Sequence, residues 1–351
     1  MPRRMRIVVT SLALFVAAVG VALVSSLPLA AQRDGSAKTS RAPKTSWGHP
    51  DLQGVWDFST GTPLQRPAEL KDKAELTQAE ADARLQRALD QRTQQDNNRT
   101  RAGDTGTYNR FWTDAPRVTS TQTSLIADPP DGRIPPFTPA AQKWYADLAA
   151  ARKGLEMDEP TLGGFVDDLG PRGLFVRCIV GFNAGPPINP SAYNQNVQIF
   201  QARDHVALLH EMVHNTRVVW LDGRPRVSSR VAQYNGDSRG RWEGDTLVVD
   251  TTNFTFKTQF RGSTERLHLI ERFTRVSESR MDYRVTVEDP ATWTRPWTYE
   301  VAWSRELDKP NHVFEPNCHE GNFGGIGMLV NTRAAERLFK EGKGTDPATQ
   351  D

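Results

Sequence analysis

The stretch that decides the fold spans residues 267–288 and has the sequence LHLIERFTRVSESRMDYRVTVE. In its second half, polar side chains separate the apolar residues Met281, Tyr283, Val285 and Val287. Successive side chains of a β-strand point to opposite faces, so this alternation places the apolar residues on one face and the polar residues on the other. The apolar face is then buried. The first half, 267–276, is also rich in β-branched and aromatic residues, and Ser-Glu-Ser at 277–279 supplies a reversal. The stretch therefore predicts two strands of an antiparallel sheet.

Similar short segments, separated by turn residues, follow one another after Val197. They are 197–201, 205–212, 216–221, 226–231, 246–253, 298–304 and 312–315. Asp222-Gly223 predicts a hairpin, because both central residues of a type I′ turn need positive φ, and NGDSRG at 235–240 predicts another reversal. With an early strand within 51–58, the chain has nine or ten strands. We expect a mainly β fold in which an antiparallel meander closes into a barrel, since closure leaves no sheet edge exposed. A β-sandwich is the alternative.

The first 31 residues are typical of a secretory signal peptide. Arg3, Arg4 and Arg6 precede the apolar run IVVTSLALFVAAVGVALV, and small residues before position 32 suit cleavage. An uncleaved membrane anchor is the alternative, because a run of about 18 apolar residues is just long enough to span a bilayer. Residues 32–46 lack periodicity and predict a flexible linker. The folded domain is then 47–345, and 346–351 form a disordered tail.

Residues 60–195 predict a long insertion of helices and loops between the first strand and the others. A helix is expected within 69–92, where Thr77 and Glu80 form a capping box, and another within 140–153. The proline-rich run 128–139 is unsuited to regular strand pairing, since proline has no amide hydrogen. These features predict a single β-barrel-like domain with a decorated insertion at 60–195.

Charge argues against one large class of partner. The chain has 44 basic and 42 acidic residues, and removal of the first 31 residues takes away three arginines and no acid. The remaining chain is close to neutral and lacks the general attraction to phosphate on which nucleic-acid binding depends. We therefore expect no nucleic-acid partner.

Two cysteines, Cys178 and Cys318, are the only ones in the sequence. In an oxidising compartment, such as the periplasm or the cell exterior, an even count predicts a disulfide. Two buried free thiols are the alternative.

Five segments together resemble a widespread family of exported bacterial proteins of unknown function. They are PDLQGVW at 50–56, TSLIADPPDGRIPP at 123–136, NGDSRGRWEGDTLVVDTTNF at 235–254, EDPATWTRPW at 288–297 and CHEGN at 318–322. The resemblance covers nearly the whole chain after the leader and implies no particular activity. Gly54 and Trp56 also resemble the Gly-x-Trp motif of calycins, which implies a calycin-like or lipocalin-like barrel.

The motif HEMVH at 210–214 matches the HExxH pattern of zinc metallohydrolases. On a helix, this spacing places two imidazoles one turn apart on zinc, with the glutamate as general base. The β-branched residues around the motif favour a strand instead, in which His210 and His214 lie too far apart to share one metal. A zinc metallohydrolase is therefore a minor alternative, and no metal site is expected.

If 208–217 is one strand, Glu211, Asn215 and Arg217 share a face that points into the barrel. Glu211 is then a candidate general acid or base, with His214 (after a bulge) or His319 as its partner. Asn215 and Arg217 are candidate ligand-binding residues, Arg217 for an anionic group. The structural alternative is an ion pair between Glu211 and Arg217.

Two loop segments contribute further candidate ligand contacts. Next to Cys318, Glu320 and Asn322 are expected at the mouth of the cavity, and the alternative is a turn anchored by the disulfide. Tyr108 and Trp112 are expected to form part of a lid, although such aromatic residues also seal the edges of cores.

Two classes of function remain open at this point. The first is an exported protein that binds a small, partly apolar molecule in a β-barrel cavity. The second is a hydrolase, lyase or isomerase that uses Glu211 with His214 or His319. Binding is preferred, because spacing alone assembles no complete catalytic constellation. We expect no cofactor, a small-molecule ligand or substrate as the partner, and membrane contact only through an uncleaved leader.

Overall fold

The computed structural model describes residues 42–97, 113–114, 120–151, 173–191, 193–258, 260–305, 307, 312–314, 318 and 323–344. The predicted signal peptide, the first part of the predicted linker and the predicted tail lie outside these ranges. Residues 44–50 form a turn in which the Thr45 amide donates to the His49 carbonyl at 2.9 Å.

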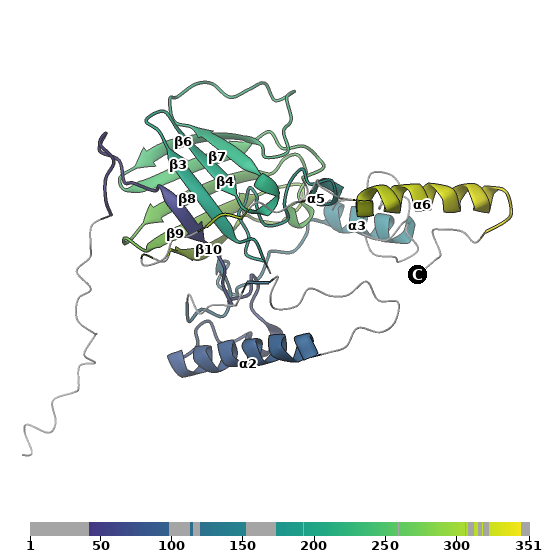
Figure 1. Ribbon diagram of the computed structural model, residues 1–351, viewed down its shortest axis with the longest axis horizontal. Helices are drawn as coiled ribbons and strands as arrows, with labels where there is room; N and C mark the ends of the chain where they lie inside the picture. The colour runs from purple at the N-terminus through teal and green to yellow at the C-terminus, as the bar shows by residue number, and fades with distance from the viewer. Residues whose placement is uncertain are drawn as a thin grey trace, which may run out of the picture. The chain divides into compact units, whose positions relative to one another are not determined.

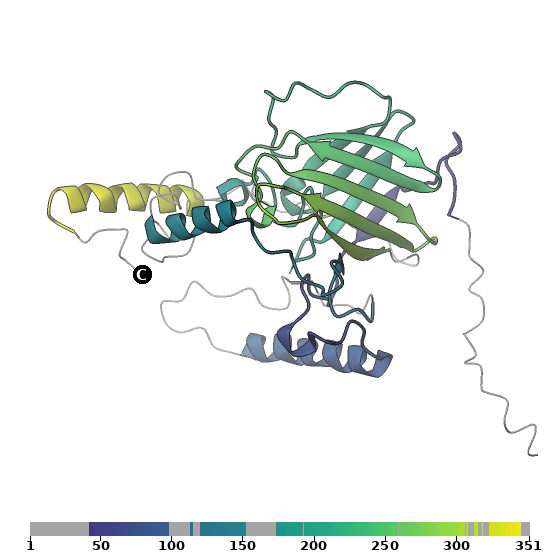
Figure 2. The same cartoon turned by 180° about the vertical axis from the view of Figure 1, so that it is seen from behind.

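In the described part of the chain, nine strands close into a barrel, as the sequence predicts (Figures 1 and 2). The strand order is β1-β3-β4-β5-β6-β7-β8-β9-β10, and pairing of Asp57 with Ser304 joins the last strand to the first. A short additional strand, β2, pairs with β10. The strands are β1 Gly54–Asp57, β2 Ile126–Asp128, β3 Asn196–Gln201, β4 His205–His210, β5 Thr216–Trp220, β6 Asp237–Glu243, β7 Thr246–Thr252, β8 His268–Arg275, β9 Arg280–Glu288 and β10 Trp297–Ser304.

The alternation in the deciding stretch determines which side chains fill the barrel. Along β9 every second residue from Met281 to Val287 is fully buried, and β8 buries Leu269, Glu271, Phe273 and Arg275 in the same way. Large aromatic side chains occupy much of the interior: Trp56, Phe58, Phe273, Tyr283, Trp297, Tyr299 and Trp303. Full burial of each contributes roughly 1.5–3 kcal/mol, so this core dominates the stability of the fold.

The structure contradicts the predicted meander at four places. Residues 312–314, expected within a strand at 312–315, form no strand. Residues 226–231 form no strand, whereas NGDSRG, expected to be a reversal, contributes most of β6. Asp222-Gly223 does not form the turn of a hairpin. The strands on either side of it, β5 and β6, pair in parallel at Trp220 and Arg239. Residues 221–236 therefore cross over between the two strands, so the barrel is mixed. Gly240 permits this contact, since a Cβ there would lie 2.8 Å from the Val219 side chain.

The longer helices are α2 Gln78–Asn97, α3 Pro139–Ala151 and α6 Phe323–Lys340; α5 Gly173–Val176 is a single turn. The capping box is confirmed: the Thr77 amide donates to Glu80 at 2.8 Å, and the Glu80 amide donates to the Thr77 hydroxyl at 3.3 Å. Helix α6 was not expected, because three of its first five residues are glycine, which disfavours helix. No helix in the described ranges is long and apolar enough to cross a membrane.

Candidate ligand-binding site

A buried ion pair lies inside the barrel. The Arg217 guanidinium donates to both carboxylate oxygens of Glu271, at 2.5 and 2.9 Å, and the Tyr283 hydroxyl donates to the same carboxylate at 2.9 Å. The side chains of Arg217 and Glu271 are 3% and 0% exposed. Arg217 thus points into the barrel as the strand pattern predicts, but its partner comes from β8. Glu211 does not pair with it.

A segment of the predicted insertion enters the barrel and contacts Tyr283, which also donates to this ion pair. We call residues 185–189 the plug segment. The Ile188 amide donates to the Tyr283 hydroxyl at 3.0 Å, and the Tyr299 hydroxyl donates to the Ile188 carbonyl at 2.8 Å. Burial raises the pKa of both tyrosines well above the usual range, so both hydroxyls stay protonated. Ile188 is 0% exposed and lies inside the barrel, where the sequence predicts a ligand.

The HEMVH motif forms the turn between β4 and β5, so the prediction of a continuous strand is wrong beyond His210. The amide of His210 donates to the Asn215 carbonyl at 2.9 Å, which closes the turn. Val213 and His214 have φ values of 50° and 51°, in the left-handed region that β-branched residues rarely adopt. The motif lacks the α-helix on which HExxH zinc sites depend. Among the described residues, no group of three or more His, Cys, Asp or Glu is placed to hold a metal ion.

Glu211 is held by three donors at the start of this turn. Its carboxylate accepts the Asn196 side-chain amide at 2.9 Å, the Asn196 backbone amide at 3.3 Å and the Phe314 backbone amide at 3.1 Å. Burial raises the pKa of Glu211, although these hydrogen bonds oppose the shift. In this arrangement Glu211 ties the β4–β5 turn to β3 and to the segment around Phe314.

Asn215 anchors the plug segment. Its side-chain amide donates to the Gly185 carbonyl at 3.3 Å, and its oxygen accepts the Asn235 side-chain amide at 2.7 Å. The remaining sequence candidates, Tyr108, Trp112, His319, Glu320 and Asn322, lie outside the described residues.

The disulfide between Cys178 and Cys318 is confirmed, with a Cα–Cα distance of 5.8 Å. Cys178 lies in a small apolar cluster with Ala184, Met212 and Val213. Gly181 permits this packing, since a Cβ there would lie 2.2 Å from the Met212 side chain. The turn of the HEMVH motif is therefore packed against the disulfide region.

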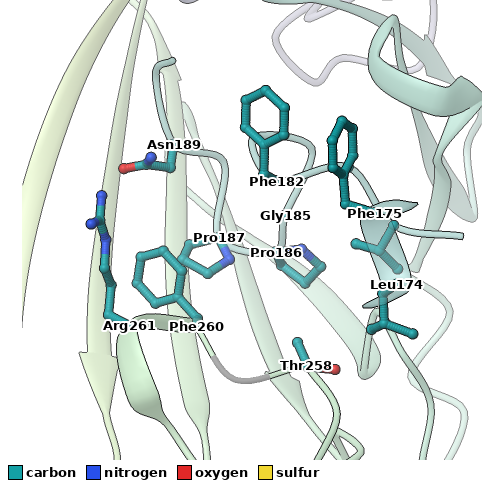
Figure 3. A pocket seen from close by; sticks show the side chains of 12 residues that line it. Leu174, Phe175, Phe182, Gly185, Pro186, Pro187, Asn189, Thr258, Phe260 and Arg261 are labelled. Carbon is teal, nitrogen blue, oxygen red and sulfur yellow. The ribbon is translucent and has the colours of Figure 1, made fainter. Parts of the chain in front are cut away.

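A pocket of about 590 Å³ lies beside the plug segment, and we call it the mouth pocket (Figure 3). Its walls come from two stretches that are distant in sequence, 174–189 and 258–261. Its lining residues are Leu174, Phe175, Val180, Gly181, Phe182, Gly185, Pro186, Pro187, Asn189, Thr258, Phe260 and Arg261.

The mouth pocket has an apolar end and a polar end. Leu174, Phe175 and Phe182 lie on one side of the pocket, and Asn189 and Arg261 are on the other side in this view (Figure 3). Arg261 belongs to a 3-10 turn, Phe260–Gly262, and has a φ of 52°. Gly262 permits α3 to pack here, since a Cβ on it would lie 2.2 Å from the Tyr145 hydroxyl. Sequence reasoning missed this site because GFNAGPPINP and QFRG have no periodicity.

A second pocket, of about 430 Å³, lies where residues 120–130 meet β9 and β10. The charged side chains in its wall already have partners, since Arg280 donates to Asp282 at 2.9 Å and Glu300 pairs with Arg284. The mouth pocket, with its apolar wall, is the better candidate for a ligand.

No protein-family model matches this chain, and no curated protein matches it. Among solved structures, the chain is similar to an abundant heat soluble (SAHS) protein from Ramazzottius varieornatus. The TM-score is 0.22 and the identity 10%, over 32% of this chain and 70% of that one. The nine-stranded closed barrel itself is compatible with the calycin-like architecture that Gly54 and Trp56 imply.

Proposed function

We propose that this protein is an exported binding protein that holds a small, partly apolar molecule in the mouth pocket. The observation that carries the proposal is the combination of aromatic and proline walls with a few polar groups in a space of about 590 Å³. Binding sites for small molecules are typically concave, mostly apolar and roughly 300–1,000 Å³ in volume. The disulfide supports export, because disulfides persist in oxidising compartments.

The plug segment favours the mouth pocket over the barrel interior as the location of the binding site. Ile188 is hydrogen-bonded at both its amide and its carbonyl to tyrosines of the barrel wall. A ligand inside the barrel would have to displace these contacts, whereas a ligand in the mouth pocket leaves them intact. The same plug forms one wall of the pocket through Pro186 and Pro187.

Two exposed phenylalanines provide a matched test. Phe182 lines the mouth pocket and is 45% exposed, whereas Phe200 lies on β3 and is 47% exposed. We expect the neutral fluorophore N-phenyl-1-naphthylamine to bind the wild-type protein. The variant Phe182→Ala should weaken binding about tenfold, a loss near 1.4 kcal/mol from the missing apolar wall. Phe200→Ala should bind like wild type; absence of binding to wild type, or equal affinities in both variants, would refute the proposal.

Acid/base catalysis by Glu211 with His214 or His319 stays the alternative proposal. It is supported by the raised pKa of Glu211, since a carboxyl group titrating nearer neutrality is a better proton donor and acceptor. Turnover of a screened substrate that is abolished in Glu211→Gln, in a variant with wild-type stability, would favour this alternative over simple binding.

A further inference from the structure

Arg261 has the properties of an anion-binding residue in the mouth pocket. Arg261 is exposed, and its guanidinium has no hydrogen bond or ion pair with the residues that the structure describes. Among the described residues that line the pocket there is no Asp, Glu or Lys, and Arg261 is the one charged side chain. An unpaired cation beside an apolar wall attracts an anion whose remaining surface is apolar.

Asn189 adds a hydrogen-bond acceptor at the same end. Its side-chain NH₂ donates to the Pro190 carbonyl at 3.1 Å, while its buried side-chain oxygen has no partner among the described groups. A buried acceptor without a donor is unfavourable, and a ligand that supplies a hydroxyl or N–H removes this penalty. Figure 3 shows this amide and the Arg261 guanidinium on the same side of the pocket.

The apolar end completes the description of the ligand. Phe175 and Phe182 pack edge to face with ring centroids 4.8 Å apart, and Leu174 and Pro186 continue the same wall. Aromatic or aliphatic groups buried against such a wall lose water contact, which favours binding. The acidic group and the apolar body of one molecule are thus accommodated at opposite ends.

We infer that the ligand class of the mouth pocket is an apolar anion, with its acidic group at Arg261 and a neighbouring hydrogen-bond donor at Asn189. This inference rests on the proposed binding function and adds the charge and the orientation of the ligand. It also assigns Arg261 as the residue that selects anions over neutral molecules of the same shape.

A pair of probes that share one ring system tests the inference. 8-Anilinonaphthalene-1-sulfonate carries a sulfonate, and N-phenyl-1-naphthylamine has the same rings and N–H without the charge. We expect the wild-type protein to bind the sulfonate probe more tightly than the neutral probe. Added salt should weaken binding of the sulfonate probe and leave binding of the neutral probe unchanged. Arg261→Gln should weaken the sulfonate about tenfold and leave the neutral probe unchanged, since a charge-assisted hydrogen bond is lost. Arg261→Lys should restore part of the affinity.

Arg266 provides the matched control, because it is an exposed arginine five positions further along the same loop and does not line the pocket. Arg266→Gln should bind both probes like wild type. If Arg261→Gln leaves sulfonate binding unchanged, or weakens both probes equally, the inference fails while the binding function stands on the Phe182→Ala result. If wild type binds neither probe, the proposed function fails and the inference with it.

Discussion

The buried pair of Arg217 and Glu271 permits a quantitative prediction about stability. Arg217→Met removes the cation and leaves the Glu271 carboxylate, which is 0% exposed, with the Tyr283 hydroxyl as its remaining donor among the contacts described above. Removing one partner of a buried ion pair costs about 3–5 kcal/mol, because the other charge stays desolvated. Glu271→Gln should cost a similar amount, since it leaves the Arg217 guanidinium without a counter-charge.

The double variant distinguishes this effect from lost packing. The double variant Arg217→Met/Glu271→Gln removes both charges and keeps an acceptor for the Tyr283 hydroxyl. We expect its free energy of unfolding to lie within about 1 kcal/mol of the wild-type value. The cost of the double variant should therefore be smaller than the sum of the two single costs by several kcal/mol, as is found for contacting residues in double-mutant cycles.

Urea denaturation in non-reducing buffer measures these free energies. The control is the exposed pair of Arg284 and Glu300, each side chain 49% exposed, for which Arg284→Met should cost about 1 kcal/mol or less. If Arg217→Met costs no more than Arg284→Met, or if the double variant costs the sum of the two singles, the account of the barrel interior is wrong.

Three further predictions concern the fold. The disulfide joins residues 140 positions apart, so replacing Cys178 and Cys318 by Ala should lower the free energy of unfolding by up to about 4–5 kcal/mol. If intact mass shows two alkylatable thiols in the denatured, oxidised protein, the disulfide does not form. Burial lowers the pKa of His210 from 6.5 to about 3, so between these values the unfolded chain binds a proton that the folded chain does not, and stability falls on acidification. At pH 5 the free energy of unfolding is therefore lower by roughly 2 kcal/mol than at pH 7. In His210→Leu, urea titrations at pH 5 and pH 7 should show no such difference from this residue. Gly181→Ala should cost about 1–3 kcal/mol through overlap with Met212, whereas Gly327→Ala, with open space around it, should be neutral or stabilising by thermal melting.

The candidate site shows where local sequence patterns stop being informative. The alternation in β9 identifies its inward residues correctly. Reading 208–217 as one strand likewise predicts that Arg217 points into the barrel, but it also predicts Glu211 beside it. The strand ends at His210, however, and the turn that follows breaks the parity on which the pairing of Glu211 with Arg217 depended. A carboxylate from β8 pairs with Arg217 instead, and only the closure of the sheet brings β5 and β8 to face each other.

By itself, the sequence determined the properties that depend on neighbours along the chain. Period-two burial in β8 and β9, the capping box at Thr77 and the β-rich character after Val197 follow from local periodicity and turn chemistry, and the cysteine count predicted the bond to Cys318. The tertiary structure alone decided the parallel pairing of β5 with β6, the entry of Ile188 into the barrel and the presence of Arg261 and Asn189 in the wall of one pocket. These contacts join segments far apart in sequence, and packing and hydrogen-bond satisfaction across the closed barrel, not local propensity, select them.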